Sequence, residues 1–188
     1  MQSTVREAHL DSRITLERIP LAGFRLFSPA KALSLYAPNA AWQETRRETE
    51  PVAYWLMKSE PGGWSWDDQV REGTAEWDGV RNHQAANNMK AMKRGDRAFF
   101  YHSGAEKRIV GTVEVVQEYY PDPTDASGRF GMVDVKAIMP FETPVSLAEI
   151  KAEPRLAELA LVRQSRLSVL PISAKEWRVI CKMGGTRP

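Results

Sequence analysis

The sequence predicts an α+β fold built on a small, curled sheet of four or five strands, with short helices between and after them. Apolar and aromatic runs of strand length, capping residues before short helical segments, and turns rich in glycine and proline support this prediction. The chain has 188 residues, 43% of them hydrophobic and 27% charged, which is ordinary for a globular protein. No apolar run approaches the roughly 20 residues that a membrane-spanning helix needs.

The first predicted strand changes character at its end. Its apolar part, Tyr54–Met57, is followed by Lys58, Ser59 and Glu60 and then by Pro61, which cannot continue a strand ladder. A cation, a hydroxyl and a carboxylate therefore stand where the sheet opens, and a rigid element positions a binding site well. The alternative is that Lys58 and Glu60 are merely solvated at a strand end.

Further elements follow the same local signals. We expect strands over three more segments rich in aromatic or alternating residues, at 97–102, 108–120 and 130–140, and a strand-like pair at 169–170. We expect short helices after the capping serines 65, 146 and 173, a helix from residue 82 to about 94, and a helical turn at 156–159. Gly111 interrupts its strand, which indicates a bulge or the close approach of another group.

The chain divides into three predicted regions. Residues 1–51 form an N-terminal extension, expected to be disordered or loosely packed, residues 52–185 form the domain, and residues 186–188 form a short tail. The extension has no acidic residue between Arg18 and Gln43, as in organelle-targeting segments. The upstream acids Glu7, Asp11 and Glu17 argue against targeting.

Signals for catalysis are weak. The single cysteine, Cys181, excludes an internal disulfide and shares an apolar helix face with Trp177, which favours a structural role. Three widely separated histidines give no zinc-binding spacing. Glu60 and His102 would form an acid–base pair if their strands adjoined, although Glu60 orienting a neighbouring cation is the simpler interpretation. We therefore expect no enzymatic activity, no cofactor and no metal.

Signals for binding are stronger. Three of the six tryptophans, Trp64, Trp66 and Trp77, lie beside polar turns, where an indole has one face free to stack. Cations are interleaved with them, namely Lys58, Arg81, Lys90, Arg163 and Arg166. Aromatic planes, hydrogen-bonding groups and cations together are what holds an unstacked nucleobase. The alternative is that the aromatic residues simply pack a small barrel.

Five motifs, in order along the chain, together resemble the EVE domain, a family of the PUA-like superfamily. They are Tyr54-Trp-Leu-Met-Lys-Ser-Glu-Pro61, Trp77-Asp-Gly-Val-Arg-Asn82, Phe99-Phe-Tyr-His-Ser103, Ile109-Val-Gly111 and Arg163-Gln-Ser-Arg-Leu-Ser-Val169. The resemblance implies a PUA-like pseudo-barrel of about five to six mostly antiparallel strands flanked by short helices. It also implies a reader of modified bases, chiefly 5-methylcytosine and its oxidised forms in DNA.

The resemblance also implies a set of site residues. The base would be bound by Lys58, Ser59, Trp77, Asn82, Tyr101, His102 and Ser165. Glu60 would support the pocket, and the phosphates would be bound by Arg81, Arg163 and Arg166. The alternatives are a structural Glu60–Arg166 ion pair, a core position for Tyr101, and a simple hydrogen bond from His102 to a carbonyl. The family commonly has Tyr-Gln-Ala-Arg where this chain has His83-Gln-Ala-Ala86, which removes one cation from the binding face.

The expected partner is nucleic acid, with modified-cytosine DNA preferred and RNA possible, and neither a membrane nor a metal is expected. A module for modified tRNA or rRNA nucleotides is the closest alternative. A small hydrolase or deaminase-like enzyme using Glu60 and His102 is the third. The expected location is the cytoplasm in a bacterium and the nucleus or mitochondrion in a eukaryote.

Overall fold

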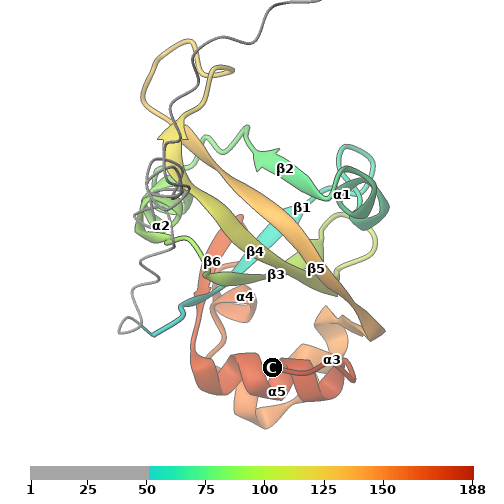
Figure 1. The fold of residues 1–188 in the computed structure, drawn as a ribbon. Helices are drawn as coiled ribbons and strands as arrows, with labels where there is room; N and C mark the ends of the chain where they lie inside the picture. The colour runs from blue at the N-terminus through green and yellow to red at the C-terminus, as the bar shows by residue number, and fades with distance from the viewer. Residues whose placement is uncertain (1–50) are drawn as a thin grey trace, which may run out of the picture. The chain divides into compact units, whose positions relative to one another are not determined.

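The computed structural model describes residues 51–188, so the predictions for residues 1–50 concern a segment outside the described residues. The described residues form six strands, and Figure 1 shows helices around them. The strands are β1 (Tyr54–Ser59), β2 (Thr74–Trp77), β3 (Arg97–His102), β4 (Arg108–Pro121), β5 (Gly131–Ser146) and β6 (Val169–Ile172). The helices are α1 (Trp66–Glu72), α2 (His83–Ala91), α3 (Leu147–Ala152), the 3-10 helix η2 (Pro154–Leu156), α4 (Ala160–Arg163) and α5 (Ala174–Met183).

The strands form one six-stranded sheet in the order β2-β5-β4-β3-β1-β6. The pair β1–β3 is parallel, and the other neighbouring pairs are antiparallel. This arrangement confirms the predicted α+β class and the mostly antiparallel sheet. The sheet is open, because β2 and β6 stand at its two edges. Register shifts between β4 and β5 mark bulges, which let these two long strands bend.

Strand β2 was not predicted as a strand. Its four residues pair with β5, and Trp77 lies opposite Val133. Four residues are too few to display an alternating pattern, so the pairing with β5 decides their conformation. The consequence is that Trp77 is held by a sheet ladder and not by a polar loop.

The helix starts follow the predicted caps. The serines before α1, α3 and α5 each form a capping box with an acid three residues later. The Asn82 side chain caps α2 by accepting a hydrogen bond from the Ala85 amide at 3.0 Å. Helix α2 ends earlier than predicted, because Met92 already has an extended conformation. The turn predicted at 156–159 is instead η2, followed by α4.

The core lies under the middle strands. Trp177 stacks on Phe99 at 3.9 Å and on Tyr54 at 4.6 Å between ring centroids. Cys181 is buried in the same cluster, and burial raises the pKa of its thiol to about 11. Trp55 and Trp177 are both buried.

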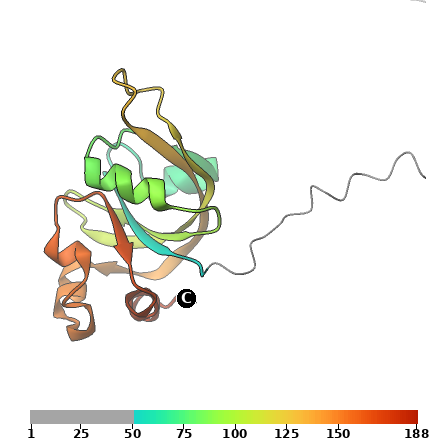
Figure 2. The ribbon, with the colours of Figure 1, turned by 90° about the vertical axis from the view of Figure 1, so that its left-hand side faces the viewer.

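Helix α2 packs against β6, β5 and β4, whereas α5 packs against β5 and η2. Figures 1 and 2 both show the hairpin loop between β4 and β5 at the end of the domain opposite α5. Within residues 51–188, no helix has the length and apolar character needed to cross a membrane.

Candidate functional site

A cavity of about 640 Å³ opens where β1 ends and the segment from β2 to α2 passes by. We call it the β1–β2 cavity, and its lining residues are Lys58, Ser59, Glu60, Gly63, Trp64, Ala75, Glu76, Trp77, Asp78, Gly79, Val80, Arg81, Asn82 and Ser168. Its volume is in the range of small-molecule sites in proteins. It therefore has room for one flat heterocycle.

Lys58 supplies a cation to this cavity from the end of β1. Its backbone N–H donates to the Ser168 carbonyl at 2.8 Å, and its Nζ donates to the Ser165 carbonyl at 2.8 Å. Desolvation by burial lowers the pKa of Lys58. No carboxylate among residues 51–188 forms an ion pair with Lys58, and an ammonium group has three donors. The amine therefore keeps donor capacity for a ligand.

The start of the β1–α1 connection is fixed by two hydrogen bonds. The Ser59 hydroxyl donates to the Trp64 carbonyl at 2.5 Å. The Trp64 indole N–H donates to the Oε1 atom of Gln69, a buried residue, at 3.0 Å. These contacts hold the half-buried Trp64 indole beside the cavity.

Trp77 forms the opposite wall. It is 7% exposed and packs edge-to-face on Phe100, with ring centroids 5.4 Å apart. The sequence predicted an indole with a whole face free to stack, but most of Trp77 is packed against the core. Only the exposed remainder of the ring reaches the cavity.

The wall continues into the start of α2 and includes two acids. The Asn82 Oδ1 atom caps the helix, which leaves its amide N–H₂ as a donor. Glu76 and Asp78 flank Trp77 and also line the cavity. Sequence reasoning missed both acids, and their position directly before and after Trp77 in the chain is the signal that could have found them.

Glu60 lines the cavity just after the end of β1, and its supporting role stays a prediction. Its Oε2 atom accepts a hydrogen bond from the Ser103 hydroxyl at 2.8 Å. Gly104 has a φ of +63°, and a Cβ atom there would collide with the Glu60 carboxylate. The described polar contact of Glu60 is thus with the turn after β3, and not with Arg166.

Three other predicted residues lie outside the cavity lining. Tyr101 is 3% exposed and lies under Lys58, whose Nζ is 5.9 Å from its ring centroid. Ser165 contributes its backbone carbonyl to Lys58. His102 belongs to a different cavity. The base-binding roles of these three residues stay predictions.

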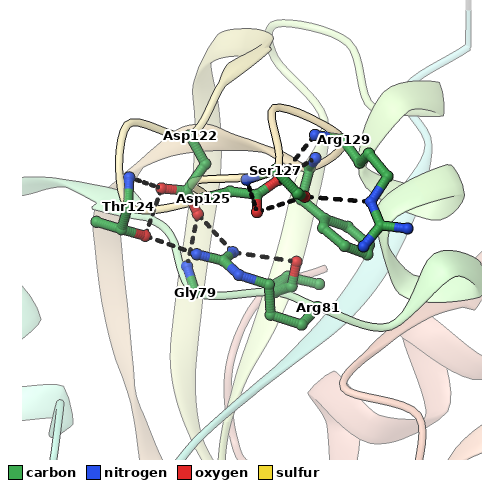
Figure 3. A network of polar contacts seen from close by, with 9 residues as sticks. Gly79, Arg81, Asp122, Thr124, Asp125, Ser127 and Arg129 are labelled. Carbon is green, nitrogen blue, oxygen red and sulfur yellow. Dashed lines mark hydrogen bonds and ion pairs between the residues drawn. The ribbon is translucent and has the colours of Figure 1, made fainter.

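The three predicted phosphate-binding arginines differ in their surroundings. Arg163 is exposed and its Nη2 atom is 2.6 Å from the Oε1 atom of Glu158. Arg166 is exposed on the connection after α4. Arg81 instead points to the β4–β5 hairpin loop, where its Nη1 atom is 2.7 Å from Oδ2 of Asp122 (Figure 3).

A second cavity, of about 450 Å³, is lined by residues from the start of α1, the end of β3, the start of β4 and the second half of β5. We call it the His102 cavity, and its lining residues are Pro61, Ser65, Trp66, Asp67, His102, Glu106, Arg108, Val110, Pro140, Phe141 and Pro144. The Trp66 ring passes so close to Gly111 that a Cβ atom there would meet it at 2.5 Å. The close approach predicted at Gly111 is therefore confirmed.

The polar groups of the His102 cavity satisfy one another. The His102 Nε2 atom accepts from the Trp66 amide at 3.0 Å, so its proton lies on Nδ1, which donates to Glu106 at 2.7 Å. Arg108 also donates to Glu106, at 2.8 Å. The hydrogen bond from His102 lowers the pKa of Glu106. Although β1 and β3 adjoin, His102 thus pairs with Glu106 and Glu60 pairs with Ser103.

No group of three or more potential metal ligands is present among residues 51–188.

Comparisons with known proteins identify relatives of the whole described domain. The profile of the EVE domain family matches residues 53–183. Thymocyte nuclear protein 1 of Mus musculus is 36% identical over 170 residues, which cover 72% of this chain and 75% of that protein.

Two solved structures are also similar. An NMR structure of a Rhodopseudomonas palustris protein has 62% sequence identity and a TM-score of 0.68, covering 71% of this chain and 94% of the other. The human THYN1 protein, solved in complex with DNA that contains 5-methylcytosine, has 32% identity and a TM-score of 0.65. That match covers 72% of this chain and 99% of the human chain.

Proposed function

Since this chain belongs to the EVE domain family, we propose that it is a non-enzymatic module that binds DNA and captures a modified cytosine in the β1–β2 cavity. The preferred base is 5-methylcytosine or an oxidised derivative. The human THYN1 protein, 32% identical, forms a complex with DNA containing 5-methylcytosine. One observation of this chain carries the proposal, which is a cavity that joins indole walls to polar groups with spare hydrogen-bonding capacity.

The polar groups match the edge of a cytosine. Its exocyclic amino group is a donor, and a carboxylate such as Glu76 or Asp78 accepts from such a group. The ring acceptors need donors, which the Lys58 ammonium and the Asn82 amide supply. The indoles of Trp64 and Trp77 offer apolar surface to the base.

The energies are consistent with capture of a base from a duplex. Extruding a base costs a few kcal/mol. Stacking on an aromatic side chain contributes about 1–3 kcal/mol, and each net hydrogen bond adds about 0.5–1.5 kcal/mol. Since little of Trp77 is exposed, Trp64 and the edge contacts must supply part of this stabilisation.

Discrimination for a methyl group has an expected size. Burial of one methyl contributes about 0.8 kcal/mol, which corresponds to about a fourfold preference. Arg163 and Arg166 are the proposed phosphate contacts, since both are exposed and lie in the same segment as Ser165 and Ser168.

The test is a binding titration of the full chain with two duplexes that differ in one 5-methylcytosine, and with an RNA of the same sequence. We expect at least about fourfold tighter binding to the methylated duplex. Equal affinity for the two duplexes, or tighter binding to RNA, would overturn the proposal.

A pair of variants locates the site in the same titration. Ser168→Leu narrows the β1–β2 cavity and should abolish the preference for the methylated duplex. The matched control, Pro144→Leu, places the same side chain at the rim of the His102 cavity and should leave the preference unchanged.

A further inference from the structure

The Asp122 carboxylate joins the hairpin loop between β4 and β5 to two residues that line the β1–β2 cavity, Gly79 and Arg81. The Asp122 side chain is 0% exposed. Its Oδ2 atom accepts from the Gly79 amide at 3.1 Å and from Arg81 Nη1 at 2.7 Å. Its Oδ1 atom accepts from the Thr124 amide at 2.7 Å and from the Thr124 hydroxyl at 2.6 Å (Figure 3). The four hydrogen bonds that this carboxylate accepts thus come from two segments, residues 79–81 beside the cavity and Thr124 in the hairpin loop.

The segment that Asp122 holds is a cavity wall without regular structure. Residues 78–82 belong to neither a strand nor a helix, and residues 78–81 lie between Trp77 and the cap residue Asn82. No sheet ladder fixes this segment, so its position depends on side-chain contacts. Gly79 has a φ of +70°, a conformation that the hydrogen bond from its amide to Asp122 helps to hold.

Arg81 is held on the hairpin side by three contacts. Its Nη1 atom reaches Asp122, its Nη2 atom donates to the Thr124 hydroxyl at 2.7 Å, and its guanidinium lies 5.9 Å from the centroid of the Phe130 ring. Burial alone would raise the pKa of Asp122, but hydrogen bonds from Thr124, Arg81 and Gly79 outweigh it and lower the pKa to about 2. The ion pair is therefore intact at neutral pH.

We propose that Asp122 is a positioning residue for the β1–β2 cavity, which acts through Gly79 and Arg81 to fix the wall between Trp77 and Asn82. In this arrangement Arg81 serves the hairpin contact and does not bind a DNA phosphate. The expected effect of Asp122 on DNA affinity rests on the proposed function, whereas its effect on the position of the cavity wall does not.

The variant Asp122→Asn distinguishes a positioning role of Arg81 from phosphate binding, because the two roles predict opposite changes in DNA affinity. Asparagine places an N–H₂ group against donors, so the wall loses its anchor. If Asp122 positions the wall, affinity for the methylated duplex falls by about tenfold, the size expected when a buried group loses its partner. If Arg81 binds phosphate, the variant frees the guanidinium and removes a negative charge, so affinity rises. A rise would overturn the proposal.

Arg81→Gln adds an independent measurement through salt dependence. Loss of one phosphate contact reduces the slope of log K against log salt by about 0.9. We expect weaker binding at every salt concentration with an unchanged slope. A reduced slope would contradict the positioning role. Because Arg81 is a surface residue with a 38% exposed side chain, this variant also serves if Asp122→Asn does not fold.

The matched control is Glu153→Gln. Glu153 also pairs with an arginine, Arg155, at 2.7 Å, and hydrogen bonds from Arg155 lower its pKa to about 2. This pair lies at η2, which packs against α5 at the end of the domain away from the hairpin loop. We expect wild-type DNA affinity in this variant. If Glu153→Gln lost as much DNA affinity as Asp122→Asn, the proposal would be overturned.

A measurement without DNA keeps the two proposals distinguishable. The Gly79 amide should be protected from hydrogen exchange in the wild type and in Glu153→Gln, and should lose protection in Asp122→Asn and Arg81→Gln. If the wild type shows no preference for methylated DNA, the proposed function fails, and this exchange pattern still decides the positioning role. Retained protection of the Gly79 amide in both Asp122→Asn and Arg81→Gln would overturn the positioning role.

Discussion

The β1–β2 cavity and the His102 cavity lie beside the paired ends of β1 and β3, where Ser59 stands opposite His102. Each cavity combines at least one tryptophan and at least one cation with carboxylates. In the His102 cavity, the histidine, Glu106 and Arg108 are bonded to one another and to the backbone. In the β1–β2 cavity, the lysine donates one hydrogen bond to a carbonyl and keeps further donors.

This difference separates structural polar groups from groups available for recognition. A polar cluster that satisfies itself stabilises the fold, and a ligand must break its hydrogen bonds to bind there. A half-buried amine with spare donors gains from a ligand that supplies acceptors. The same types of side chain thus indicate a structural role at the His102 cavity, where they bond to one another, and a binding role at the β1–β2 cavity, where donors are left over.

The largest expected effect is at the wall of the β1–β2 cavity. Trp77→Ala should abolish discrimination between methylated and unmethylated duplexes, because it removes the indole at that wall. Removal of a buried tryptophan should also cost about 3–5 kcal/mol of unfolding free energy.

Trp77→Phe provides a folded companion that keeps an aromatic ring near Phe100. We expect reduced discrimination for Trp77→Phe and wild-type discrimination for Trp66→Phe, which changes the ring beside the His102 cavity. Binding titrations together with thermal unfolding measure both effects. Full discrimination in both Trp77 variants would remove this residue from the site.

The smallest expected effect is at the His102 cavity. Glu106→Gln should leave DNA binding unchanged and lower the free energy of unfolding by at most about 1 kcal/mol, since the carboxylate is partly exposed. The lowered pKa of Glu106 means that its contribution is present above the unfolded pKa of about 4.3 and is lost as pH falls through the folded pKa.

Urea unfolding at neutral and acidic pH checks this expectation. The difference in stability between wild type and Glu106→Gln should be larger at neutral pH and should shrink at acidic pH. A variant with impaired DNA binding would instead assign a recognition role to the His102 cavity.

Much of the site's framework is readable from local sequence. The polar end of β1 and the cap at Asn82 are set by residues within a few positions, and both lie at the cavity. The resemblance implies base contacts from both Tyr101 and His102, yet neighbouring residues of a strand point to opposite faces. Strand alternation was therefore enough to place them apart.

Other features depend on contacts across the chain. The Arg81–Asp122 ion pair joins residues 41 positions apart, and no local pattern marks an arginine as engaged. Strand β2 exists because β5 offers an edge for pairing. The resemblance implies a phosphate-binding role for Arg81, and the structure adds a partner, Asp122, that engages its charge.

The most direct test follows the indole N–H signals of the tryptophans in ¹⁵N–¹H NMR spectra while a duplex containing one 5-methylcytosine is added. If the β1–β2 cavity receives the base, the signals of Trp64 and Trp77 shift, while those of Trp55, Trp66 and Trp177 stay in place. Shifts at Trp66 alone, or unchanged signals at both Trp64 and Trp77 under saturating DNA, would contradict capture of the base in this cavity.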